Sequence, residues 1–557
     1  MRASSSKVKS TFWKGTNLIH NMYMHFFHSP IKYIKRNLIR SYIRGYLILK
    51  KENRLFIIDD LLSRMRQVKI VKDNIPGSSF LFGPAVSYYD LIIRQRTSKI
   101  NHVLVISLLI YFSGRTKRII CPLPREWSLF LLRDGYPVSI SLNNFLWSSY
   151  CIFRFLSGFK RFFYIISCFF SLKKNYKNIG KPFVFLINLH RNNFPSSQIA
   201  DSDCSLIDWL SRNLDHLDTV RSIHHSVKDV PNSHPSGLSL TFTSDCIPPL
   251  FGLKAFLLFL LYTFKYLIIS FYWGIQGRWW FYLMFVEFLD SQLIKLSQSH
   301  RLARSYWFNN GFYYPPLWTY YASERGSKIL MYFYSTNSEP WIQQNDILPP
   351  SNMYSLMNWP SYLVWDEYQC NVVKNYSNPT ADIKIVGPIS FSSTDSTYTK
   401  IVNPSVGVFD VQPHRLSQYA KYGLPFDYYV PSVAISFLSD IHDVSSSKNV
   451  NFVYKTKRNI GRLIHPRFRS FLNSFLQNGD VQCIPSEVSA FELIEQVDIV
   501  ISYPFTSVAI AAMHIGKPVV YYDPIGIVKI NDPAAHGVSV IRSKFELSAW
   551  FDENLMN

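Results

Sequence analysis

The sequence predicts an α/β protein, and three observations carry that prediction. Residues 401–557 alternate between short apolar runs and amphipathic runs about every ten to fifteen residues, as doubly wound α/β domains do. Residues 181–400 contain further apolar runs that end in polar residues, as buried parallel strands do. Residues 1–180 lack this alternation and read as basic helical segments. We therefore expect two domains built on parallel sheets behind a basic, mostly helical N-terminal extension.

Charge separates the extension from the rest of the chain. The protein has 557 residues, enough for two to four domains, and a formal net charge of +22. Residues 1–180 hold 30 Lys and Arg against 7 Asp and Glu, whereas the remaining residues hold 29 against 30. Hydrophobic residues make up 48% of the chain and charged residues 17%, which excludes a disordered protein. The surplus charge of the extension therefore serves something other than the chemistry of the later domains.

The expected elements follow the chain in order. Between 181 and 400, we expect strands in 182–190, 328–337, 361–367 and 383–389, a helix over 205–227, apolar helices within 251–296 and a linker around 390–400. From 401 on, the sequence predicts strands at 405–411, 449–457, 480–485, 498–503 and 518–523, separated by helices at 432–444, 465–477, 489–496 and 507–516. The predicted domains are 1–180, 181–400 with the apolar helical insertion at 251–296, and 401–557.

Two segments have the composition of membrane contacts. Residues 255–276 contain one charge, Lys265, and are long enough to span a bilayer. A central lysine costs roughly 2.5 to 3.5 kcal/mol, while the Leu, Ile and Phe residues return about 3 to 7. A span would send residues 300–557 to the outer side of the membrane, so we favour a helix in the membrane interface or one buried in the protein. Residues 153–177 mix Phe with Lys and Arg, which also fits nucleic acid, but no RNA- or DNA-binding motif accompanies them and no nucleic acid partner is expected.

Cysteine usage favours a reducing compartment. The seven cysteines are scattered and include no CxxC pair, so neither a disulfide framework nor a zinc site is expected. Residues 1–15 are basic and have no apolar segment behind them, which argues against an ordinary secretory signal. We expect the protein to stay in the cytosol.

The chemistry of such a fold belongs at the carboxyl ends of its parallel strands. One of these ends runs from Ser502 through Pro504 and Thr506 to Ser507, directly into a helix of small residues. A helix N-terminus offers free N–H groups and a positive dipole, and adjacent hydroxyls can complete a phosphate site. In the alternative interpretation, Ser502 or Thr506 merely caps the helix and Pro504 shapes its first turn.

A second strand end carries cations. Lys455, Lys457 and Arg458 follow a buried strand and could neutralise a phosphate leaving group, although such clusters are more often solvated surface. His465 follows and could contact the same nucleotide. A third end, with Asp410 and His414, faces the same region of the domain, and its role stays open.

These residues resemble a known family. The run VISYPFTSVAIAAMHIGKPVVYYDP, the Tyr-Lys-x-Lys-Arg pattern at 454–458, VFDVQP at 408–413 and PPLWTYYASERGSKILMYFYSTN at 315–337 resemble bacterial surface-polysaccharide biosynthesis proteins with a PFTS motif. The resemblance covers about 181–557. It implies two Rossmann-like domains of the B-type glycosyltransferase fold, with the donor nucleotide on the C-terminal domain. Pro504, Phe505, Thr506 and Ser507 would then lie by the donor phosphate. The helix after this turn, VAIAAMHIG, lacks the glutamate that many B-type transferases use to hold the ribose.

The resemblance implies a glycosyltransferase that moves a sugar from a nucleotide-sugar donor to a glycan or lipid-linked acceptor, as in capsule or O-antigen synthesis. It would need no metal and no cofactor, because cations and helix dipoles stabilise the departing phosphate. For the base at the acceptor hydroxyl, the candidates are His190, Asp366 and Glu367. The basic N-terminal region would hold the enzyme on the inner face of the cell membrane. The alternatives are a nucleotide-sugar epimerase, a polyol-phosphate transferase, or a non-catalytic membrane or nucleic-acid binder.

Overall fold

The structure is a computed structural model of the whole chain. It describes residues 28–68, 89–171 and most of 182–555. Inside the last range, the description omits residues 190–192, 195–205, 218–219, 221, 231, 234–236, 337–338, 344–345, 349–353, 390–400, 403, 422–427, 457–460, 478 and 487.

The first domain is built on a parallel sheet. Among the described residues it has seven strands in the order β3-β2-β1-β4-β5-β8-β9, and every pair is parallel. The strand bounds are Val184–Leu186 (β1), Ser222–His225 (β2), Ser239–Phe242 (β3), Ser305–Asn309 (β4), Lys328–Tyr332 (β5), Ser361–Val364 (β8) and Asp382–Ile385 (β9). Strands β6 (Trp341–Gln343) and β7 (Asp346–Leu348) form a separate antiparallel pair.

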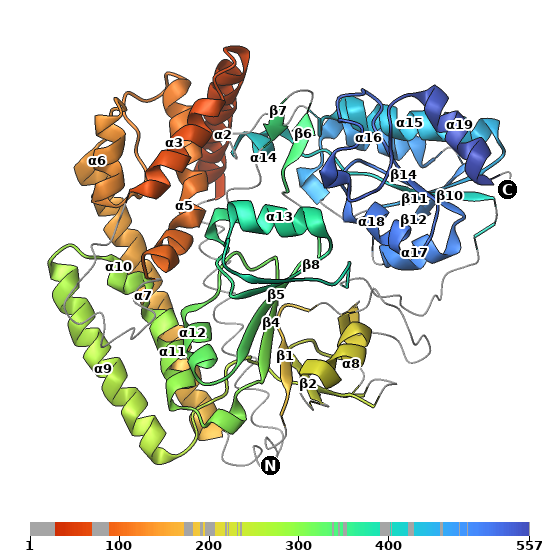
Figure 1. The fold of residues 1–557 in the computed structure, drawn as a ribbon. Helices are drawn as coiled ribbons and strands as arrows, with labels where there is room; N and C mark the ends of the chain where they lie inside the picture. Colours follow the sequence, from red (N-terminus) through yellow and green to blue (C-terminus); the bar gives the residue numbers. More distant parts are fainter. Residues whose placement is uncertain are drawn as a thin grey trace. The chain divides into compact units, whose positions relative to one another are not determined.

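Helices cover both faces of this sheet (Figure 1). On one face, α8 (Leu206–Leu217) packs Leu206 and Leu210 into the core cluster that includes Trp307. On the other face, α12 (Leu317–Glu324) places Trp318 against Tyr306 at a ring distance of 4.9 Å. Adjacent residues of a strand point to opposite faces of the sheet, so Tyr306 and Trp307 of β4 pack against the helices on the two different faces. Helix α13 (Glu367–Tyr376) links β8 to β9.

The second domain has the strand order of a Rossmann fold. Its six described strands are all parallel and are ordered β12-β11-β10-β13-β14-β15. The first strand of the domain, β10, lies in the middle, and the chain adds strands on one side of it up to β12 and on the other side from β13 onward. The strands are Ser405–Phe409 (β10), Asn451–Lys455 (β11), Val481–Ile484 (β12), Ile499–Ser502 (β13), Val519–Tyr522 (β14) and Val540–Ile541 (β15). Figure 1 shows α15 (Pro431–Ser447), α16 (Pro466–Phe475) and α19 (Lys544–Leu555) on one face, with α17 (Ala490–Gln496) and α18 (Ser507–His514) on the other.

The predicted α/β class, with two Rossmann-like domains and a helical N-terminal region, is confirmed. Each strand expected from the sequence is present, and so is each helix expected after residue 401. The helix expected over 205–227 is wrong in its second half, because α8 ends at Leu217 and Ser222–His225 form β2 with alternating burial. Strands β3, β4, β6, β7 and β15 were not predicted. The linker expected at 390–400 lies outside the described residues.

The N-terminal region contains five described helices. They are α2 (His28–Lys51), α3 (Phe56–Gln67), α5 (Tyr89–Phe112), α6 (Arg125–Arg133) and α7 (Ile140–Ser171). The chain divides into two compact units: Met1–Ile70, Lys99–Trp147 and Leu416–Pro425 form the first, and Val71–Ser98, Ser148–Arg415 and Phe426–Asn557 form the second. Both sheet domains belong to the second unit. The domain boundaries expected at 180 and 400 stay a prediction.

Some residues before 180 are built into the second unit. Gln95 donates to the carbonyl of Leu356 at 2.8 Å. Arg96 forms an ion pair with the buried carboxylate of Glu287, on α11 (Phe285–Leu296). Glu287 also accepts the backbone N–H of Leu317, at the first residue of α12, at 2.9 Å. This pairing ties α5 and α11 to the helix layer of the first sheet domain.

Within the described residues, one helix is long and apolar enough to cross a membrane. Helix α9, Leu253–Ile275, lies in the insertion expected from the sequence.

Candidate nucleotide site

A cavity of about 240 Å³ lies at the carboxyl ends of the strands of the second sheet domain. It is located where the strand order reverses, between β10 and β13, which is where open α/β sheets bind their ligands. Its walls come from the ends of β10 and β11, from the loop after β12 with the start of α17, and from the start of α18: Phe409, Asp410, Lys455, Ser486, Val488, Ser489, Ala490, Thr506, Ser507 and Val508. Three of the residues predicted to hold a donor, Lys455, Thr506 and Ser507, thus share one cavity.

The turn from β13 into α18 has an unusual backbone. Phe505 has a φ of 58°, in the left-handed region that a bulky side chain rarely adopts. The ring of Phe505 lies 5.1 Å from that of Trp341 and 6.0 Å from that of Tyr521. The hydroxyl of Tyr521 donates to the carbonyl of Thr506 at 2.8 Å. The strained turn is therefore packed against Trp341 and Tyr521.

The hydroxyls of this turn do not cap the helix that follows. Thr506 is the N-cap residue of α18, but its side chain makes no capping hydrogen bond. Instead, the hydroxyls of Ser502 and Thr506, both buried, hydrogen-bond to each other. The interpretation in which Thr506 acts only as a cap is therefore wrong. In the first turn of α18, the N–H of Ala509 donates to the carbonyl of Thr506 at 3.2 Å, whereas Ser507 and Val508, which precede it, line the cavity.

The cation of the cavity is fixed in place. The side chain of Lys455 is buried, and its Nζ donates to the carbonyls of Thr456 at 2.9 Å and Pro485 at 2.8 Å. Two carbonyl partners hold the ammonium group near the cavity. An anion placed there would meet a positive charge in a low-dielectric environment, where electrostatic attraction is stronger than in water.

The cavity also contains a carboxylate. Asp410 is 1% exposed and accepts a hydrogen bond from the hydroxyl of Tyr454 at 3.0 Å. Burial, followed by the charge of Asp410, raises the pKa of Tyr454 well above its ordinary value, so the tyrosine stays a donor. A carboxylate repels phosphate and accepts hydrogen bonds from sugar hydroxyls. Phe409, the residue before Asp410, pairs with Lys455 on one side and with Ser502 on the other, so this carboxylate lies between the cation and the turn into α18.

The other residues predicted to bind the nucleotide-sugar donor lie away from the cavity or are not among the residues that the structure describes. His465 is the N-cap of α16, where its Nδ1 accepts from the N–H of Arg467 at 3.2 Å. Pro504 is buried in the turn and does not line the cavity. Lys457 and Arg458 lie outside the described residues, as does His190.

The two remaining base candidates follow β8 in the first domain. Glu367 is exposed in the first turn of α13. Asp366 is the N-cap of that helix and accepts from the N–H of Gln369 at 2.9 Å. Its other carboxylate oxygen lies 2.5 Å from Nδ1 of His536. The carboxylate of Asp366 is therefore already engaged by two donors, and the assignment of the base stays a prediction.

His536 is the residue that sequence reasoning missed. Its ring is buried, with Nε2 2.8 Å from the carboxylate of Glu339 and Nδ1 beside Asp366. Burial opposes the charge, but the two carboxylates outweigh it and raise the pKa of His536 to about 10. Burial alone would raise the pKa of Asp366, but the hydrogen bond to His536 and the charge of His536 lower it. His536 follows β14 of the second domain, whereas Glu339 and Asp366 follow β5 and β8 of the first. No local sequence pattern links them.

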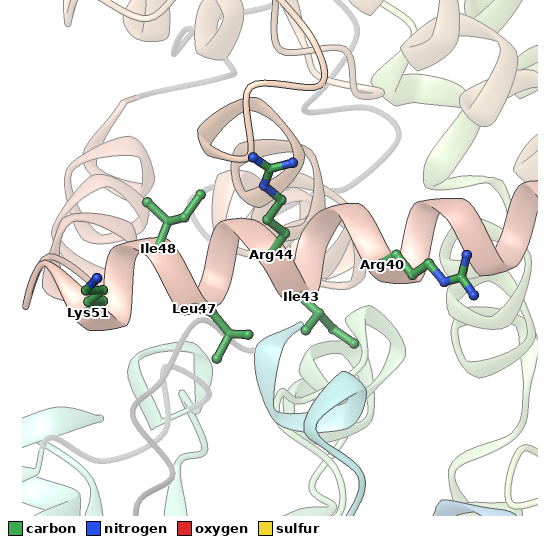
Figure 2. Close-up of a pocket in the computed structure, with 6 residues that line it drawn as sticks. All are labelled: Arg40, Ile43, Arg44, Leu47, Ile48 and Lys51. Atoms are coloured by element: carbon green, nitrogen blue, oxygen red, sulfur yellow. The ribbon is translucent and has the colours of Figure 1, made fainter.

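A second hollow, of about 460 Å³, lies in the first compact unit along α2. Its lining combines three cations with three aliphatic side chains, all from that one helix: Arg40, Ile43, Arg44, Leu47, Ile48 and Lys51. Figure 2 shows Arg44 and Ile48 pointing to one side of the helix, with Ile43 and Leu47 pointing to the other. Because these side chains do not converge, they do not form a ligand site.

Within the part of the chain that the structure describes, no three His, Cys, Asp or Glu residues gather as metal ligands would. Independence from metal stays a prediction.

Two Rossmann-like domains, with a cavity at the strand ends of the second, define the chain as a protein of the B-type glycosyltransferase fold. Its family is shown by a family model. The model for polysaccharide biosynthesis PFTS motif proteins matches residues 253–551, more than half of the chain, and the protein belongs to that family.

Solved structures that match the chain include the following two, both at low sequence identity. UGT2 of Phytolacca americana, solved with UDP-2-fluoro-glucose and pterostilbene, is 11% identical over 67% of this chain and 84% of its own, with a TM-score of 0.26. UDP-GlcNAc 2-epimerase of Methanocaldococcus jannaschii is 9% identical over 68% of this chain and 93% of its own, with a TM-score of 0.33. A comparison with curated protein sequences gives no match.

Proposed function

We propose that the protein is a glycosyltransferase that transfers a sugar from a nucleotide-sugar donor to a glycan or lipid-linked acceptor in surface-polysaccharide synthesis. The observation that carries this proposal is the shared cavity of Lys455, Thr506 and Ser507. Membership of the polysaccharide biosynthesis PFTS motif family supports the pathway. Capsule and O-antigen are the surface polysaccharides to which we assign it.

The proposed reaction places the donor phosphate at the N-terminus of α18. An acceptor oxygen attacks the anomeric carbon, the bond from that carbon to the phosphate oxygen breaks, and the nucleotide leaves with the bonding electron pair. The ammonium of Lys455 and the α18 dipole stabilise the charge that develops on the leaving phosphate. Asp410, which lies between Lys455 and the turn into α18, accepts hydrogen bonds from donor hydroxyls. A base in the first domain takes the acceptor proton.

A nucleotide-sugar assay tests the proposal. Purified full-length protein is incubated with UDP-, GDP- and CMP-sugars, with and without lipid-linked or glycan acceptors. Release of free nucleotide that depends on the acceptor supports a transferase. Conversion of the donor sugar without any acceptor indicates an epimerase instead. Absence of both sugar transfer and nucleotide binding with every donor contradicts an enzyme of this class.

A further inference from the structure

Helix α9 exposes a continuous apolar stripe. Large apolar side chains recur along it every three or four residues and are between 55% and 71% exposed: Leu253, Leu257, Leu261, Phe264, Ile268, Phe271, Tyr272 and Ile275. At 3.6 residues per turn, this spacing places them on one side of the helix. A helix of 23 residues is about 35 Å long. A water-soluble surface rarely carries so long an unbroken apolar stripe.

The opposite side of α9 is packed against the first sheet domain. Its buried residues include Tyr266, whose ring lies 4.2 Å from that of Phe288 on α11 and whose hydroxyl donates to the carbonyl of Phe281 at 2.5 Å. Helix α11 also carries Glu287 and Asp290, in ion pairs with Arg96 and Arg161. Drawing these charges into a bilayer would be costly. The packing therefore argues against α9 as a membrane-spanning helix.

Helix α7 packs beside α9 and exposes apolar side chains of its own. Phe169 stacks on Phe256 of α9 at 4.2 Å, and Phe162 stacks on Phe259 at 6.0 Å. Along its part in the second unit, α7 exposes further large apolar side chains: Ile152, Phe153, Leu156, Phe163, Tyr164 and Phe170. The paired helices thus present aromatic and aliphatic side chains from two elements.

The charge of the two helices has one sign. Neither α7 nor α9 contains an Asp or Glu, whereas they hold Arg154, Lys160, Arg161, Lys254 and Lys265. Lys160, Lys254 and Lys265 are exposed beside the apolar residues. Long lysine side chains can lie along apolar surface and keep their ammonium groups in water, as at a membrane interface. Cations of this kind complement an anionic lipid leaflet.

We propose that the exposed faces of α7 and α9, the α7–α9 surface, dock the protein onto an anionic lipid bilayer. Helix α9 lies in the plane of the interface, with its apolar stripe among the acyl chains and its lysines among the headgroups. The docking does not depend on the nucleotide cavity, so it goes beyond the proposed function and can fail separately from it.

Vesicle flotation tests the docking. Full-length protein is mixed with vesicles of phosphatidylcholine alone or with added phosphatidylglycerol. We expect flotation with the anionic vesicles, weakened by salt, and at least roughly tenfold weaker binding for the triple variant Leu261→Asn, Phe264→Asn and Ile268→Asn. The matched control is Val402→Asn, Ile530→Asn and Phe545→Asn, which changes three exposed apolar residues of the second domain and should bind like the wild type.

Three outcomes overturn the proposal. They are equal flotation of both triple variants, absence of flotation of the wild type with anionic vesicles, and membrane-bound protein that resists extraction by alkaline carbonate, which would indicate a span. Thermal unfolding and nucleotide binding, both measured without vesicles, show whether the triple variant is folded. If it is not, the single variant Phe264→Asn replaces it, with Phe545→Asn as its control. Loss of nucleotide binding alone would count against the cavity and not against the membrane surface.

Discussion

The buried imidazole of His536 lies 2.8 Å from the carboxylate of Glu339, a residue 197 positions earlier in the chain. Glu339 follows β5 of the first sheet domain, and His536 follows β14 of the second. Asp366 completes the group on the other ring nitrogen. An imidazolium held between two carboxylates thus links the strand ends of the two domains.

Replacing this histidine should destabilise the fold. His536 has a φ of 52°, which asparagine tolerates, so His536→Asn removes the charge and the ring without a large backbone penalty. Glu339 is then left buried without its cation, and we expect a loss of about 3 to 5 kcal/mol in the free energy of unfolding. Urea unfolding measures it. His514→Asn, at an exposed histidine, should change the value by less than about 0.5 kcal/mol. Equal effects of the two variants would contradict a stabilising role for His536.

The same cluster predicts a pH dependence. The pKa of His536 is about 10 in the folded protein against 6.5 for an unperturbed histidine. The stabilisation is therefore fully present below about pH 6.5 and is lost as the pH rises through about 10. The difference in unfolding free energy between the wild type and His536→Asn should shrink steadily over that interval. A difference that grows with pH would show that the histidine is neutral in the folded protein.

Replacing the cavity lysine should weaken phosphate binding selectively. Lys455→Met is expected to reduce affinity for a nucleoside diphosphate by about 1.5 to 3 kcal/mol, the range for a hydrogen bond to a charged group, and to leave affinity for the bare nucleoside unchanged. Lys517→Met is the matched control, because Lys517 also donates to a backbone carbonyl, that of Val497 at 2.6 Å, but lies outside the cavity. Calorimetry with the two ligands measures the effect. Parallel losses for nucleoside and nucleotide would indicate that the lysine acts only on the fold.

The strained turn predicts an inverted preference between alanine and glycine. At Phe505, whose φ is positive, alanine keeps the backbone strain and glycine relieves it, so Phe505→Gly should be more stable than Phe505→Ala by about 1 kcal/mol. At the exposed helical position Phe545, glycine should be the less stable of the two by a similar amount. Thermal unfolding of the four variants compares them. Glycine less stable than alanine at both positions would show that the turn adopts another conformation.

Much of the fold was predictable because its periodicity is local. Short apolar runs such as 405–411 and 498–503 became β10 and β13, and the small-residue helix after them became α18. Residues 222–225 were assigned to a helix because the amphipathic period of α8 leads into them without a glycine or proline. Tertiary pairing with β1 and β3 decided their conformation, and single-sequence patterns do not carry that information.

The candidate site was predictable only in part, for the same reason. Ligands bind at the carboxyl ends of parallel strands, and this rule predicted that Lys455, Thr506 and Ser507 belong to the site. These three residues line one cavity. The contact of Trp341 with Phe505 and the cluster around His536 join segments far apart in the chain. Neither contains a motif, so only the three-dimensional structure reveals them.

Calorimetry of nucleotide-sugar binding to the double variant Thr506→Ala, Ser507→Ala tests the central claim most directly. With the UDP-, GDP- or CMP-sugar that binds the wild type, we expect a loss of about 1 to 3 kcal/mol in binding free energy. Because Thr506→Ala also removes the buried hydrogen bond to Ser502, some decrease in melting temperature is expected in either case. Ser543→Ala, which removes a hydroxyl at the start of α19 away from the cavity, should bind like the wild type. Unchanged affinity of the double variant, together with a lower melting temperature, would contradict a donor phosphate at the start of α18.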